Sequence, residues 1–274
     1  MAREAAALVL AGNGTNCERE TAFACRTGGF ARVDIVTVWE LLHGDTTLAG
    51  YHLLVFPGGF LDGDDLGSAK AQANRFLHSA PGGSGETLFA HILRFIGDGG
   101  LVLGICNGFQ LMAKLGLLPA IDRDYGRQTV TLTNNDSGRF EDRWVWLRAN
   151  PASPCVFTAG LDRLYLPVRH GEGKFVARDS DMLDAVLAAN LAPVVYADPA
   201  TFAPTNRYPD NPNGSQAAVA GVCDPTGRLF GLMPHPEGYL FRTNHPRWTR
   251  DDVPAEGMGV AFFRNACRYV QTKA

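Results

Sequence analysis

Short apolar runs alternate with amphipathic segments along the first part of the chain. The apolar runs predict buried strands at residues 5–11, 32–38, 52–56 and 100–104. Apolar positions at helical spacing predict helices at 17–28, 67–79, 86–97 and 107–116. Alternating strands and helices predict an α/β fold, with a mostly parallel sheet and helices on both faces.

Beyond about residue 125 the pattern changes to β-hairpins. Two apolar runs, 217–223 and 228–233, flank the turn sequence Asp-Pro-Thr-Gly at 224–227. A last segment, from about 259 to 269, has helical spacing. The chain shows no internal repeat, and we expect residues 1–274 to form a single domain with added hairpins.

Cys106 lies between a predicted strand and a predicted helix, flanked by Gly104 and Gly108. A Gly-x-Cys-x-Gly turn at such a junction is typical of a nucleophile elbow, with sulfur as the nucleophile. The glycines relieve crowding in a tight, strained turn. The positive end of the following helix lowers the pKa of a thiol placed there. A buried core cysteine is the alternative interpretation.

His235 lies between Pro234 and Pro236 and offers a base for such a thiol. Prolines favour extended backbone, in which residues two apart face the same side, so Glu237 can orient the imidazole. Cysteine, histidine and glutamate in these roles form a nucleophilic triad. A loop histidine without a catalytic role is the alternative.

A glycine pair follows the predicted strand 52–56 and suggests an oxyanion hole. The backbone N–H of Gly59 is open to a substrate, and the N–H of Asn107 follows the nucleophile. Both glycine pair and cysteine come at the carboxyl ends of predicted strands, where α/β sheets hold their sites. Taken alone, the glycine pair is equally typical of an ordinary turn.

The chain resembles the class I (triad-type) glutamine amidotransferases. The resemblance rests on Phe-Pro-Gly-Gly-Phe at 56–60, Gly-Ile-Cys-Asn-Gly-Phe-Gln at 104–110 and Met-Pro-His-Pro-Glu at 233–237. It extends from about residue 6 to about residue 270. Segments 14–21, 134–141, 170–173 and 211–215 resemble the glutaminase part of formylglycinamide ribonucleotide amidotransferase. Leu61-Asp62-Gly63 departs from that pattern, and the length and the segment 242–250 are more like the fused enzyme.

This resemblance implies a flavodoxin-like fold and a glutaminase with Cys106, His235 and Glu237 as catalytic residues. Glutamine would be hydrolysed through a cysteine thioester. The ammonia would go to an ATP-binding synthetase subunit that converts formylglycinamide ribonucleotide to formylglycinamidine ribonucleotide in de novo purine biosynthesis. Gln110 and Phe140 are implied glutamine contacts, although Phe140 is equally suited to core packing. The family's ATP and magnesium are expected on the partner.

Composition narrows the classes of function. The net charge of −3 gives no electrostatic basis for binding nucleic acid, and no apolar stretch reaches membrane-spanning length. The six cysteines form no Cys-x-x-Cys pair, so we expect no metal site and reduced thiols in the cytoplasm. The Gly-x-Gly at 12–14 lacks the third glycine of a dinucleotide fingerprint, and no P-loop for ATP occurs, so we expect no cofactor in this chain.

Three alternatives stay open at this point. The chain could be a glutaminase subunit that serves a different acceptor synthetase. It could be a hydrolase or chaperone of the flavodoxin-like group with an elbow cysteine, although the downstream His-Pro-Glu argues against that. It could also be a non-enzymatic glutamine-binding module, against which the complete Cys, His and Glu set argues.

Overall fold

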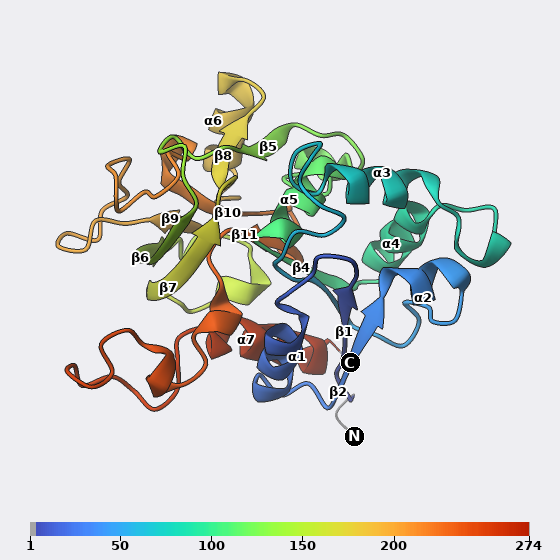
Figure 1. The fold of residues 1–274 in the computed structure, drawn as a ribbon, viewed down its shortest axis with the longest axis horizontal. Coiled ribbons are helices and arrows are strands. Elements are labelled where there is room, and N and C mark those ends of the chain that lie inside the picture. Colours follow the sequence, from blue (N-terminus) through green and yellow to red (C-terminus); the bar gives the residue numbers. More distant parts are fainter. Residues whose placement is uncertain (1–3, 274) are drawn as a thin grey trace.

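A nine-stranded sheet runs through the computed structural model, which describes residues 4–273 (Figure 1). In spatial order its strands are β2 Arg32–Thr37, β1 Ala6–Ala11, β3 Leu53–Phe56, β4 Leu101–Ile105, β11 Leu229–Leu232, β10 Val219–Cys223, β9 Val194–Tyr196, β6 Glu141–Ala149 and β7 Arg163–His170. A separate antiparallel pair is formed by β5 Val130–Thr133 and β8 Lys174–Ala177.

The sheet has a parallel part and an antiparallel part. From β2 through β1, β3 and β4 to β11, every neighbouring pair is parallel. From β11 through β10, β9 and β6 to β7, every pair is antiparallel. The predicted α/β class is therefore confirmed, and the added hairpins extend the parallel sheet at one edge.

Helices cover both faces of the parallel part (Figure 1). Helices α1 and α7 pack against each other on one face, and α3, α4 and α5 form a connected layer on the other. The helices are α1 Glu18–Thr27, α2 Val38–His43, α3 Lys70–His78, α4 Leu88–Gly97, α5 Asn107–Lys114, α6 Ser180–Ala188 and α7 Val260–Thr272.

Most predicted elements of the first 116 residues are found within a few residues of their expected ends. Strand β2 stops at Thr37, one residue early, because Thr37 and Glu40 form a capping box that starts α2. Neither α2 nor α6 was predicted. Helix α6 begins at a similar local signal, since the Asp179 side chain accepts a hydrogen bond from the backbone N–H of Met182 at 2.8 Å.

The pairing of β4 with β11 brings distant segments to one place. Gly104 pairs with Gly231, and Ile105 with Leu232. The N–H of Cys106 donates to the carbonyl of Leu232 at 2.8 Å. The strand 228–233 was predicted as one arm of a hairpin, and its parallel pairing with β4 is what sets the ends of both strands side by side.

Helix α5 lies very close to the sheet behind Cys106. A Cβ built on Gly108 would lie 1.9 Å from the carbonyl oxygen of Phe56 in β3. A Cβ built on Gly104 would lie 2.7 Å from the backbone of Gly108. Helix and strands can approach this closely only because both positions lack a side chain.

We therefore predict that Gly108→Ala destabilises the protein by about 1–3 kcal/mol or more, since overpacking usually costs that much. Gly97→Ala in α4 is the matched control, since nothing lies within 4 Å of a Cβ at Gly97. Alanine is the better helix former, so the control should be neutral or slightly stabilising. Urea unfolding of the two variants measures the difference, and equal midpoints would contradict the close approach.

Candidate active site

Cys106 occupies a strained turn between β4 and α5. Its backbone has φ +52° and ψ −105°, in a region that residues other than glycine seldom adopt. The thiol is nearly buried and lies 3.6 Å from the carbonyl oxygen of Arg169, to which it can donate a hydrogen bond. This turn directs the sulfur into a cavity, beside the free N–H groups at the start of α5.

His235 and Glu237 form a buried pair next to this thiol. His235 Nδ1 lies 2.5 Å from Glu237 Oε1, and both side chains are almost fully buried. The backbone N–H of His235 donates to the carbonyl of Pro167 at 2.8 Å. Pro236 begins a 3₁₀ turn, so the segment is not extended as the prolines suggested, and this turn brings the carboxylate to the imidazole.

The surroundings of His235 favour its charged form. Burial alone lowers the pKa of the imidazole, but the Glu237 carboxylate and the adjacent thiols of Cys106 and Cys17 outweigh it. The pKa of His235 is therefore held well above its usual value. Among the described residues, His235 Nε2 has no hydrogen-bond partner and stays available for a substrate proton.

Gly59 is held in place by a neighbouring loop. Its φ is +144°, and a Cβ there would lie 2.7 Å from the carbonyl oxygen of Gly14. The N–H of Phe60 donates to the same carbonyl at 2.8 Å, and the N–H of Cys17 donates to the carbonyl of Gly58 at 3.3 Å. The glycine-rich loop 12–17 thus supports the backbone of the candidate oxyanion hole.

Asn107 links that loop to the substrate side of the site. Its side-chain carbonyl accepts from the N–H of Leu61 at 3.1 Å, and its amide donates to Gln110 Oε1 at 3.0 Å. Gln110 in turn donates to the carbonyl of Glu172 at 2.6 Å. The two ends of the Gln110 amide are engaged within the protein, which makes Gln110 a supporting residue of the cavity wall.

A cavity of about 780 Å³ opens beside these residues. Every candidate site residue predicted from the sequence lines this cavity except Asn107. The Asn107 side chain points instead to the backbone of Leu61. Phe140 is 55% exposed, so it is not a core residue, which decides against the packing alternative. The lining includes the charged side chains of Glu20, Asp64, Glu172, Arg139 and Arg169, together with His170 and Cys17.

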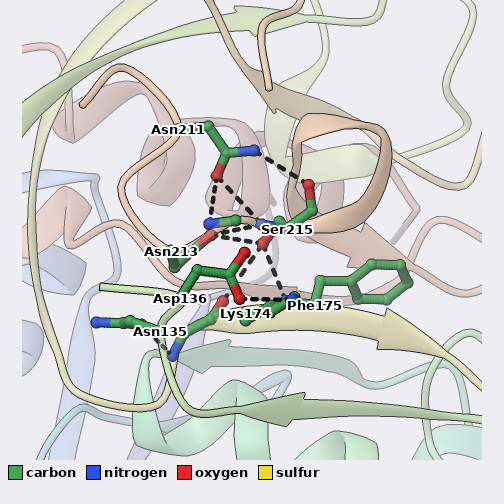
Figure 2. Close-up of polar contacts among 9 residues, drawn as sticks. Asn135, Asp136, Lys174, Phe175, Asn211, Asn213 and Ser215 are labelled. Atoms are coloured by element: carbon green, nitrogen blue, oxygen red, sulfur yellow. Dashed lines mark hydrogen bonds and ion pairs between the residues drawn. The ribbon is translucent and has the colours of Figure 1, made fainter. Parts of the chain in front are cut away.

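A polar network that includes Asn135, Asn213 and Ser215 (Figure 2) holds the wall formed by residues 134–140 and 170–173. The Asn135 amide donates to the carbonyls of His170 and Arg139 at 2.8 and 2.9 Å, and its oxygen accepts from the N–H of Gly173 at 2.9 Å. The Ser215 hydroxyl lies 2.7 Å from Asn213 Oδ1 and accepts from the N–H of Phe175 at 2.9 Å. Three segments distant in sequence are joined here.

His170 is a neutral member of this network. Its Nδ1 lies 3.2 Å from the Asn135 side-chain oxygen, and its Nε2 lies 3.5 Å from the Asn213 amide nitrogen. The first contact requires a donor and the second an acceptor, which fixes the proton on Nδ1. Burial, with help from the nearby His235, lowers the pKa of His170 to about 3.

Several cavity residues were not singled out from the sequence. The Arg169 carbonyl faces the Cys106 thiol, and Asp64 and Ser68 line the cavity from the segment between β3 and α3. The N–H of Ser68 donates to the Glu172 carboxylate at 3.2 Å. No motif surrounds Asp64 or Ser68, whereas Arg169 directly precedes the segment 170–173 and Cys17 lies in the segment 14–21.

Comparison with known families agrees with this site. The model of the CobB/CobQ-like glutamine amidotransferase domain matches residues 4–270. The chain therefore belongs to the glutamine amidotransferases. This membership decides against the elbow-cysteine hydrolases and chaperones.

Individual relatives narrow the assignment to one branch of the family. The chain is 42% identical to "Phosphoribosylformylglycinamidine synthase subunit PurQ" of Dehalococcoides mccartyi, with 96% of this chain and 97% of that protein covered. It is 37% identical to the phosphoribosylformylglycinamidine synthase of Drosophila melanogaster, of which the match covers 16%. The length and the segment 242–250 therefore do not single out the fused enzyme, since the first relative is a subunit of similar span.

A solved structure shares the fold. One chain of "PurLQS from Thermotoga maritima" superposes with a TM-score of 0.68 at 27% identity, covering 97% of this chain and 99% of that one. The shared architecture extends over both the parallel and the antiparallel part of the sheet. Within residues 4–273, no helix has the length and apolar character needed to cross a membrane.

The lowered pKa of His170 gives a testable dependence of stability on pH. The unfolded chain binds this proton below about pH 6.5, whereas the folded chain binds it only near pH 3. The stabilisation is therefore complete above about pH 6.5 and is lost as the pH falls towards 3, with a slope of up to about 1.4 kcal/mol per pH unit.

We predict that His170→Gln makes the loss of stability between pH 7 and 4 shallower than in the wild type. His43→Gln, at an exposed position, is the control and should keep the wild-type slope. Urea unfolding at several pH values gives the free energies. Parallel curves for wild type and His170→Gln would show that His170 is not buried in its neutral form.

Proposed function

We propose that this chain is the glutaminase subunit of a phosphoribosylformylglycinamidine synthase. It hydrolyses glutamine to glutamate and ammonia and supplies the ammonia to a synthetase subunit. The observation that carries the proposal is the elbow thiol of Cys106 beside the buried His235–Glu237 pair, in the lining of a cavity large enough to hold glutamine. Membership of the PurQ branch favours formylglycinamide ribonucleotide as the acceptor of the ammonia over the acceptor of a different synthetase.

In the proposed mechanism the Cys106 thiolate attacks the side-chain amide carbon of glutamine. Negative charge builds on the amide oxygen and is held by the N–H groups of Gly59 and Asn107. His235 gives its proton to the departing nitrogen, which leaves as ammonia. Water, deprotonated by His235, then hydrolyses the thioester and releases glutamate. Glu237 keeps the imidazole in the required orientation throughout.

The cavity also suits the zwitterionic end of glutamine. Arg139 and Arg169 offer positive charge for its α-carboxylate, and Glu20, Asp64 and Glu172 offer negative charge for its α-ammonium. The exposed ring of Phe140 covers apolar atoms of the bound substrate. Gln110 contributes indirectly, by fixing the backbone of Glu172.

The binding sites for ATP, magnesium and the acceptor are expected on the synthetase partner and not on this chain. ATP and magnesium bind to that subunit, where the acceptor is formylglycinamide ribonucleotide and the product is formylglycinamidine ribonucleotide in de novo purine biosynthesis. We assign the complex to the cytoplasm and treat residues 1–274 as one glutaminase domain. A single continuous hydrophobic core across the sheet supports the assignment of one domain.

We predict that Cys106→Ser, in complex with the synthetase subunit, lowers glutamine-dependent synthesis by at least about 10³-fold. Synthesis from added ammonia should persist, because Cys106 only releases ammonia from glutamine. Cys267→Ala is the control, since this buried cysteine lies in α7 outside the cavity. Equal loss of both activities in Cys106→Ser would overturn the proposed role.

His235→Ala should be at least roughly ten-fold more damaging than Glu237→Gln, because the imidazole transfers the proton and the carboxylate only orients it. Glu237→Gln should also move the histidine limb of the pH–rate profile to lower pH. Burial lowers the pKa of His235, and the variant removes the main charge that opposes burial. Glutamate release measured against pH gives both results. If this limb of the profile does not move, the Glu237 carboxylate does not raise the pKa of His235 and the role assigned to it is wrong.

A further inference from the structure

Cys17 brings a second thiol to the candidate triad. Its sulfur, one ring nitrogen of His235 and a carboxylate oxygen of Glu237 all lie within 4.8 Å of one another. A Cβ built on Gly58 would lie 3.3 Å from Cys17 Sγ and 2.8 Å from His235 Cε1. The mechanism proposed above gives Cys17 no part.

Both buried residues of this cluster carry a polar atom that could still bind an ion. His235 is 3% exposed and Glu237 is 5% exposed. Among the described residues, His235 Nε2 and Glu237 Oε2 have no hydrogen-bond partner. Cys17 is only half-buried and lines the cavity, so a solute can reach the cluster from outside.

Sulfur, imidazole nitrogen and carboxylate oxygen together form a typical donor set for Zn²⁺. Zinc bonds of about 2.0–2.3 Å put neighbouring ligand atoms up to about 4 Å apart. The three donor atoms therefore need only small side-chain movements to surround one ion. A fourth position faces the cavity, where water or the Cys106 thiol, which lies beside the same imidazole, can complete a tetrahedron.

We propose that Cys17, His235 and Glu237 form an inhibitory binding site for a thiophilic divalent cation such as Zn²⁺. The bound ion takes lone pairs that the imidazole and carboxylate otherwise use to move and hold a proton. The cation and catalysis therefore exclude each other. Binding itself is independent of the proposed function, whereas inhibition rests on it.

The test uses the full chain and Zn²⁺ as the probe, with a chromophoric chelator as competitor. The wild type should bind one ion. Cys17→Ala should bind it at least about ten-fold more weakly, since loss of even an outer partner of a metal site costs about that much. Cys267→Ala, a buried cysteine in α7, should bind as the wild type does. Cys106→Ala should keep a bound ion, which separates this site from a simple Cys106–His235 pair.

Inhibition is measured on the complex with its synthetase subunit. Zn²⁺ should inhibit glutamine-dependent synthesis reversibly, and Cys17→Ala should raise the inhibitory concentration by the same factor by which it weakens binding. Co²⁺ in place of Zn²⁺ should show thiolate charge-transfer absorption that Cys17→Ala reduces. Circular dichroism confirms that each variant is folded.

Equal Zn²⁺ affinity in wild type and Cys17→Ala, or no binding by the wild type, would overturn the proposal. So would loss of binding in Cys106→Ala with Cys17 intact. If the wild type binds Zn²⁺ but has no glutaminase activity with its partner, the metal site stands and the proposed function fails. The two proposals can therefore be judged separately.

Discussion

The parallel pairing of β4 with β11 is the contact on which the candidate active site depends. Cys106 follows β4 and His235 follows β11, more than a hundred residues later. Because parallel strands end at the same edge of a sheet, the thiol and the imidazole arrive together. The hydrogen bond from Cys106 N–H to the Leu232 carbonyl continues this pairing to the nucleophile itself.

The rest of the site is built around that edge by close backbone contacts. Gly108 lets α5 lie against β3, and Gly59 lets the loop after β3 lie against residues 14–16. The Asn107 side chain then ties that loop to α5, and through Gln110 to the backbone of Glu172. Glycines at the close backbone contacts, and side-chain amides that link the neighbouring segments, thus hold the hydrogen-bond donors of the cavity in place.

The antiparallel half of the sheet supplies the far wall of the cavity. β7 ends at His170, whose neutral ring is held between Asn135 and Asn213. Such a buried network costs little only when every polar group in it has a partner. The segments 134–141, 170–173 and 211–215, which looked like separate signatures in the sequence, are joined by hydrogen bonds into one structure that holds the loop around Glu172.

The sequence by itself determined the α/β class, the strand and helix positions up to 116 and the candidate triad, because these rest on local signals. Hydrophobic periodicity, the glycines around Cys106 and the prolines around His235 act over a few residues. Helices α2 and α6 were missed although both begin at local caps, the capping box of Thr37 and Glu40 and the Asp179 side chain. The roles of Arg169, Asp64 and Ser68 carried no local signal. Only the tertiary structure placed Cys17 beside His235, since that contact depends on how β1, β3 and β11 are ordered in the sheet. Spacing along the chain does not encode that order.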